Sequence, residues 1–156
     1  MWLDDDGNEH RQRQFCYAFF NGQAIVGDWQ NGNLYSMSQE LYTDDGEEVR
    51  RIRSFPHLVD NGNRVRYTSA IVDIETGNGL QVSLERPELR LRWSDTRGRS
   101  WGTHISNNLG STGEFLHSCK FTRLGMARDR VFEVSWAADC KTSMNGMFVE
   151  LQPGAS

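Results

Sequence analysis

The residues best suited to metal binding or covalent chemistry in this sequence are its histidines and cysteines. There are four histidines and three cysteines: His10, His57, His104, His117, Cys16, Cys119 and Cys140. Only His117 and Cys119 are close in sequence, and an alternating strand would place both on one face. A structural zinc site usually needs more ligands at short, regular spacings, so this pair favours an ordinary strand over a metal site.

Two acidic stretches could supply oxygen ligands to a cation. "LDDDGNE" (3–9) clusters three aspartates before a glycine, and "YTDDGEE" (42–48) contains an Asp-Gly pair. A calcium loop needs alternating oxygen ligands and a distal glutamate. The first stretch does not have this spacing, so we interpret both as solvated acidic turns.

Local motifs of the common catalytic and cofactor-binding classes are missing from the sequence. It has no G-x-S-x-G, no Walker loop, no H-E-x-x-H and no G-x-G-x-x-G. No serine, histidine and aspartate are arranged in a recognisable triad pattern. We therefore predict that the protein is not an enzyme, with no catalytic residue, no metal and no cofactor.

The elements that carry these residues are predicted to be β-strands. Hydrophobic and polar residues alternate with a period of two, which is typical of half-buried antiparallel strands. In residues 88–94, Leu89, Leu91 and Trp93 share one face and the two arginines share the other. The same pattern occurs at residues 51–55, 64–75, 130–136 and 146–152. Strict alternation within 64–75 places Tyr67 and Ala70 on opposite faces.

Turn signals separate these strands at short intervals. Glycine-containing turn sequences, mostly with Asn-Gly or Asp-Gly pairs that supply positive φ angles, occur at 21–23, 30–33, 44–47, 60–63, 75–79, 95–98 and 111–114. Short strands with glycine turns predict an all-β fold: a β-sandwich, a barrel or antiparallel β-propeller-like blades. Little helix is expected, and only residues 124–130 fit about one helical turn.

The length of 156 residues predicts a single all-β domain over residues 1–156. Residues 15–55 contain four predicted strands, which is the size of one propeller blade. The rest of the chain has room for two more such units, whereas a closed propeller typically needs about four to eight blades. The sequence therefore predicts either another β arrangement, such as a sandwich, or a partial propeller whose open edges are covered by partners.

Charge and targeting signals limit the function classes. The formal charge of −4 and the pI near 5.5 disfavour a sequence-specific DNA-binding protein, although DNA passing alongside the chain is compatible with them. Three cysteines without a C-x-x-C pair indicate reduced, mostly buried thiols. The N-terminus has no signal-peptide pattern, and no stretch approaches the roughly 20 apolar residues of a membrane span. We therefore expect a chain that is soluble, or that is assembled into something soluble.

The stretch "SDTRGRSW" (94–101) fits loosely the Asp-box pattern S-x-D-x-G-x-T-W, whose polar side chains cap a hairpin turn. Thr96 stands at the aspartate position of the pattern, and Asp95 lies one position early. We predict that this stretch is a structural hairpin turn. The residues that form it are Ser94, Thr96, Gly98, Ser100 and Trp101.

Four longer motifs are spread along the chain. "AIVGDWQNGNLYSMSQELYTDDGEEVRRIRSFPHL" (24–58) is followed by "DIETGNG" (73–79), "LRLRWSDTRGRSW" (89–101) and "LGSTGEFLHSCKFTRLGMARDRVFEV" (109–134). In this order they resemble the packaged-DNA stabilisation proteins of short-tailed bacteriophages, also called tail accessory or nozzle proteins. The resemblance runs from about residue 15 to residue 151 and covers the C-terminal part of those longer proteins.

The resemblance implies a structural protein of the virion. Such a chain would form a ring, as a homo-oligomer, below the portal and adaptor proteins of the phage tail, after assembly in the host cytoplasm. The ring would extend the DNA channel and retain the packaged DNA, without binding it sequence-specifically.

Two further expectations concern surfaces. Arginines on outward strand faces are candidates for contacts between subunits: Arg51, Arg53, Arg90 and Arg92. The alternative function is an Asp-box carbohydrate-binding or host-recognition module, for which the five tryptophans could supply stacking platforms. Core and hairpin packing is the interpretation that we favour for most of these tryptophans.

Overall fold

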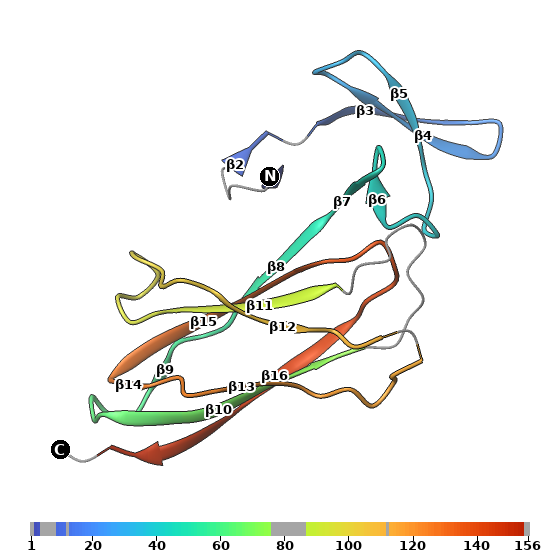
Figure 1. Ribbon diagram of the computed structural model, residues 1–156. Helices are drawn as coiled ribbons and strands as arrows, with labels where there is room; N and C mark the ends of the chain where they lie inside the picture. The colour runs from blue at the N-terminus through green and yellow to red at the C-terminus, as the bar shows by residue number, and fades with distance from the viewer. Residues whose placement is uncertain (1, 4–8, 12, 76–86, 112, 155–156) are drawn as a thin grey trace. The chain divides into compact units, whose positions relative to one another are not determined.

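The structure, a computed structural model, describes residues 2–3, 9–11, 13–75, 87–111 and 113–154 (Figure 1). The regular elements within these residues are all β-strands, and their pairings are antiparallel, which confirms the all-β prediction. The chain divides into two compact units, Met1–Tyr42 and Thr43–Ser156, here named the N-terminal unit and the sandwich unit. The assignment of residues 1–156 to one domain stays a prediction.

The N-terminal unit contains a strand pair and a three-stranded meander. β1 (Trp2–Leu3) pairs with β2 (Glu9–His10). The meander has the order β3 (Gln14–Phe20), β4 (Gln23–Asp28) and β5 (Leu34–Met37). Asn21 and Gly22 join β3 to β4 with φ angles of 49° and 78°, the left-handed conformation that the Asn-Gly pair predicts.

The sandwich unit begins with the short hairpin of β6 (Thr43–Asp44) and β7 (Glu47–Glu48) and continues into two larger sheets. One sheet has the order β12-β11-β15-β8, with β9 also paired to β15. Its strands are β8 (Arg50–Ser54), β9 (Leu58–Val59), β11 (Glu88–Ser94), β12 (Ile105–Asn108) and β15 (Asp129–Ala137). In the other sheet, β10 (Val65–Ile74) lies between β16 (Met144–Pro153) on one side and β13 (Cys119–Thr122) with β14 (Met126–Ala127) on the other.

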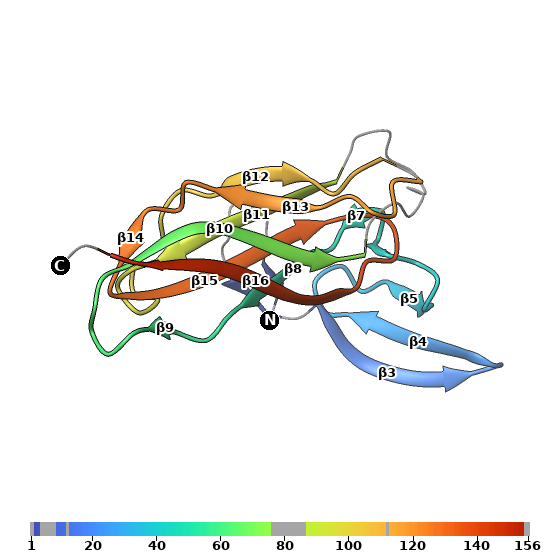
Figure 2. The same ribbon diagram turned by 90° about the horizontal axis from the view of Figure 1, so that it is seen from below.

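The two sheets pack face to face around one hydrophobic core (Figures 1 and 2). Leu89 and Leu91 of β11 and Phe132 and Val134 of β15 supply fully buried side chains from one sheet. The other sheet contributes Ala70 and its neighbours on β10 together with residues of β13. Of the predicted arrangements, the sandwich is therefore the one that this unit adopts.

The four-strand blade predicted over residues 15–55 is not formed. β3, β4 and β5 make a separate meander, whereas β8 pairs with β15 along Arg50–Ser54. The sequence pattern identified the strands correctly but not their partners. The reason is that alternation sets the faces of a strand and says nothing about which strand lies beside it.

A β-bulge at Thr68 changes the predicted faces of β10. Tyr67 pairs with Leu151 and Ser69 with Glu150, so Thr68 is the extra residue in β10. Before the bulge, Tyr67 points into the core, and after it Ala70 does so as well. The placement of these two residues on opposite faces was therefore wrong, because the bulge shifts the alternation by one residue.

The helical turn expected at residues 124–130 is also not present. This segment contains β14 and the start of β15, separated by a bend, and follows a turn in which Arg123 and Gly125 have φ angles of 61° and 78°. Two positive φ angles so close together are incompatible with a right-handed helix.

Candidate functional site

The loop between β11 and β12 is a hairpin turn held by its own side chains. Ser94 Oγ accepts hydrogen bonds from the backbone amides of Thr96 (3.2 Å) and Gly98 (2.9 Å). Arg97 and Gly98 both have positive φ angles, 59° and 82°. The serine therefore satisfies amides that the tight turn would otherwise leave without a partner.

Thr96 makes the next set of contacts in the same turn. Its Oγ1 accepts the amide of Ser100 at 2.9 Å and lies 2.7 Å from the Ser100 hydroxyl. A threonine thus supplies the local acceptor at the position where the Asp-box pattern has an aspartate. The Ser94, Thr96, Gly98 and Ser100 set lies together as the structural turn that the sequence predicts.

Asp95, which lies one position early in the Asp-box pattern, forms a bidentate ion pair with Arg130. Arg130 Nε lies 2.6 Å from Asp95 Oδ1, and Arg130 Nη2 lies 2.8 Å from Asp95 Oδ2. The Arg130 side chain is only 2% exposed, and it also donates to the carbonyl of Leu124. No local sequence pattern indicates this pair, because its members are far apart in the chain and arginine is seldom buried.

Three aromatic rings surround the Arg130 guanidinium. Its central carbon lies 4.5 Å from the ring centre of Tyr67, 5.1 Å from that of Trp93 and 5.7 Å from that of Phe132. Cation–π contacts of this kind strengthen when water is excluded. Burial raises the pKa of the Tyr67 hydroxyl, against the opposing effect of the Arg130 charge. Arg130 therefore anchors one end of the sandwich core.

Asp129, next to Arg130 in sequence, lies between the side chains of His57 and Arg97. Its Oδ1 is 2.7 Å from His57 Nδ1, and its Oδ2 accepts a hydrogen bond from Arg97 Nε at 2.7 Å. The bonds from His57 and Arg97 lower the pKa of the Asp129 carboxyl. The result is a second ion-pair group beside the Asp95–Arg130 pair, and it ties the β11–β12 turn to β15.

Two of the four candidate interface arginines lie on the outer face of their sheet. Arg92 is paired with Glu133, with Nε 2.6 Å from Oε1, and its guanidinium lies 4.9 Å from the ring centre of Trp101. Arg90 Nε lies 3.4 Å from Glu88 Oε2. Both arginines thus have partners within the chain, and their role between subunits stays a prediction.

The outward orientation predicted for Arg51 and Arg53 is wrong. Arg51 pairs with Trp136 and Arg53 with Val134, and paired residues in an antiparallel sheet lie on the same face. Because both partners face the core, the two arginines lie on the inner face of the edge strand β8, and Ile52 lies on the outer face. Arg51 donates to the carbonyl of Ala138 at 3.1 Å.

His117 and Cys119 were predicted to lie together on an ordinary strand, and only Cys119 lies in one, β13. His117 Nε2 lies 3.1 Å and Cys119 Sγ 3.5 Å from the same acceptor, the carbonyl oxygen of Asn108. Burial raises the pKa of the Cys119 thiol to about 11, so it stays protonated at neutral pH. Among the described residues, no three His, Cys, Asp or Glu side chains are grouped to hold a metal ion. The Asp4–Asp6 stretch lies outside those residues.

All three cysteines are free. Cys119 and Cys140 are buried as predicted, and Cys16 is exposed. The tryptophans divide similarly: Trp136 is buried, Trp93 packs against the core, and Trp29 is 48% exposed beside Arg11. Trp101 is covered in part by Arg92. This distribution fits packing better than a row of sugar platforms.

No family model matches the chain, and no curated protein sequence matches it significantly. A search for membrane spans in the described residues finds no helix that is long and apolar enough to cross a bilayer.

Proposed function

We propose that this chain is a structural subunit of a bacteriophage tail that assembles into a ring around the DNA channel. The observation that carries the proposal is the apolar surface of β3. Phe15, Tyr17, Phe19 and Phe20 are between 65% and 71% exposed in this single strand. Soluble monomers rarely expose large contiguous apolar patches, and such patches usually mark interaction sites. In a ring, neighbouring subunits would bury the apolar side chains of such a strand.

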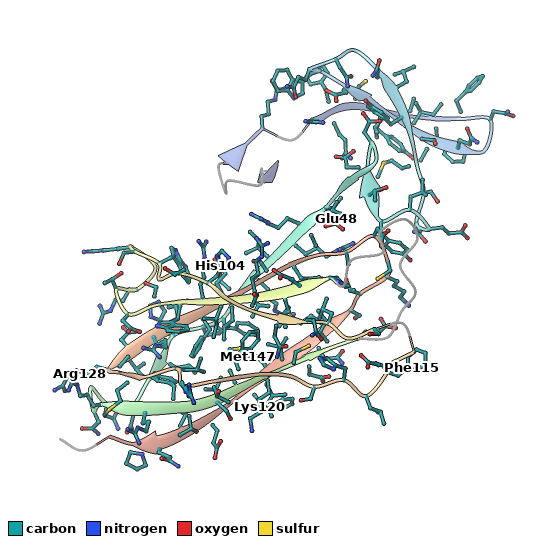
Figure 3. All side chains as sticks on the ribbon, in the orientation of Figure 1. Glu48, His104, Phe115, Lys120, Arg128 and Met147 are labelled. Atoms are coloured by element: carbon teal, nitrogen blue, oxygen red, sulfur yellow. The ribbon has the colours of Figure 1, made fainter. Side chains whose placement is uncertain are left out.

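The sandwich unit supplies further surfaces that suit assembly. β16 is paired only with β10 among the described strands, so its other edge is open, and its Phe148 is 68% exposed. Phe115, labelled in Figure 3, and Leu116 lie in the loop between β12 and β13 and are 69% and 98% exposed. Open edges and apolar loop tips are covered in a cyclic assembly, where head-to-tail contacts close on themselves.

In this proposal the partners are other copies of the chain, the portal or adaptor proteins and other tail proteins. DNA passes through the ring, and the protein is found in the virion. The motifs between residues 15 and 151 motivate the phage assignment, and the exposed surfaces support the assembly.

The test has two parts. Negative-stain imaging and mass photometry of the purified chain should show rings with cyclic symmetry, and mass spectrometry of purified virions should detect the chain. The paired change Phe15→Ser and Phe19→Ser should reduce assembly, and Ala18→Ser in the same strand is the matched control. Monomers at all concentrations, together with binding to host glycans, would support the carbohydrate-binding alternative and contradict the proposal.

A further inference from the structure

One end of the sandwich unit concentrates positive charge. Three segments form this end, named here the arginine end: residues 57–66, 95–100 and 122–130. Together they contain seven arginines and three aspartates, a formal excess of four positive charges. The whole chain has a net charge of −4, so the remainder carries −8. The acidic total therefore conceals a basic surface.

The contacts between the three segments show that they form one surface. Val65 and Arg66 of β10 pair with residues of β14, which joins the first segment to the third. Arg128, labelled in Figure 3, donates to the carbonyl of Gly62 at 2.5 Å. Arg97 reaches Asp129 and so joins the second segment to the third.

Most of this positive charge is available to a ligand. Arg64, Arg66, Arg99 and Arg123 are exposed, and none of their side chains makes a hydrogen bond or ion pair with the part of the chain that the structure describes. Arg97 is 75% exposed beyond its contact with Asp129.

The aspartates of the arginine end are largely occupied. Asp95 is paired with Arg130, and Asp129 contacts His57 and Arg97. Asp60 has no such ion pair among the described residues. Each of these pairs is neutral as a unit, so the remaining charges of the arginine end keep the formal excess of four that a ligand meets.

The opposite end of the strands has the other sign. β10 runs from Val65 at the arginine end to Ile74, next to Glu75, and β15 runs from Asp129 to Ala137, close to Asp139. Cys140 lies at this far end. Burial and the charge of Asp139 raise the pKa of its thiol, whereas the charge of Arg51 opposes this shift. A polyanion is therefore attracted more strongly to the arginine end than to the far end.

We propose that the arginine end contacts the phosphate backbone of duplex DNA without reading its sequence. One guanidinium group can donate two parallel hydrogen bonds to the oxygens of one phosphate. The lysines and arginines of this end are all arginines. Exposed loop arginines without an ordered recognition element fit backbone contacts and not base readout. The inference rests on the proposed function and deepens it, because it identifies the end of the subunit that faces the channel.

The experiment measures binding of the purified full chain to a fluorescein-labelled random-sequence duplex by anisotropy, over a series of salt concentrations. The variant Arg64→Gln, Arg99→Gln, Arg123→Gln should bind about tenfold or more weakly at low salt. Each lost phosphate contact should reduce the slope of log K against log salt by about 0.9, so the triple variant should lose about 2.7. Its unfolding midpoint should not change, because these side chains make no hydrogen bond or ion pair with the residues that the structure describes.

The matched control removes the same charge elsewhere, as Arg50→Gln, Lys120→Gln, Lys141→Gln. Its DNA affinity and salt slope should stay close to those of the unchanged chain. Equal weakening by both variants, or no binding at low salt, would overturn the inference. Loss of self-association without loss of DNA binding in the first variant would also overturn it, and would assign the arginine end to an acidic surface of another copy. Rings found in virions that do not bind DNA would leave the proposed function standing.

Discussion

Replacement of Asp95 by asparagine is expected to destabilise the sandwich unit by about 3 kcal/mol. The partner, Arg130, is 2% exposed, and an arginine keeps its charge inside a protein. Removing one member of a buried ion pair costs about 3–5 kcal/mol, because the other charge is left uncompensated. The Asp95 side chain is 44% exposed, so water offsets part of the loss and the lower end of the range applies.

Urea unfolding followed by tryptophan fluorescence measures this change, since Trp93 lies beside the guanidinium. In a thermal scan the same loss corresponds to a fall of about 6–12 °C in Tm for a chain of this length. Asp60→Asn, at an exposed aspartate of the same end, is the matched control and should stay within about 0.5 kcal/mol. The double variant with Arg130→Met should be more stable than Asp95→Asn alone, because no unpaired arginine charge is then left buried at this site.

Two results would refute this reasoning. One is a loss below about 1 kcal/mol for Asp95→Asn, which would show that Arg130 does not depend on this carboxylate. The other is a double variant whose loss equals the sum of the two single losses, since additive effects indicate sites that do not interact.

Four other predictions concern the same end and the thiols. Gly98→Val should cost about 2 kcal/mol in calorimetry, because a β-branched residue is strained at a φ of 82°. Thr96→Val should cost about 1 kcal/mol through the lost acceptor, whereas Thr96→Asp should stay within about 0.5 kcal/mol. The Asp129 carboxylate has a lowered pKa, so its contribution to stability is complete above the unfolded pKa of about 3.9 and is lost as pH falls through the folded value. Asp129→Asn should flatten that acid limb in unfolding measured against pH. Ellman's reagent should modify Cys16 in the folded protein and Cys119 only after unfolding.

The strands and turns of this protein were predictable because their signals are local. Alternation in 88–94 places Leu89 and Leu91 on one face, and both are fully buried. Asn-Gly and Asp-Gly pairs occur where the backbone needs positive φ angles, as at Asn61 and Gly62. Each of these features depends on a few neighbouring residues, which a single sequence displays directly.

The features that the sequence did not predict depend on contacts between residues that are distant in the chain. Arg51 faces inward because β8 is an edge strand paired with β15, and its guanidinium reaches a carbonyl at that edge. The bulge at Thr68 is set by the pairing of β10 with β16. The Asp95–Arg130 pair forms only when the β11–β12 turn meets the start of β15. No local pattern specifies any of these contacts, so the sequence predicted the turn but not its anchor.

The long pairing between β10 and β16 also affects how the protein folds while it is being synthesised. β16 covers one edge of β10 from Val65 to Ile74, yet its own residues follow it by about 80 positions in the chain. While the ribosome translates the intervening segment, the backbone groups on that side of β10 have no strand beside them. The sheet is completed only after residue 153 has emerged from the ribosome. A translational pause before Met144 therefore prolongs the time in which a nascent chain can pair with the wrong strand.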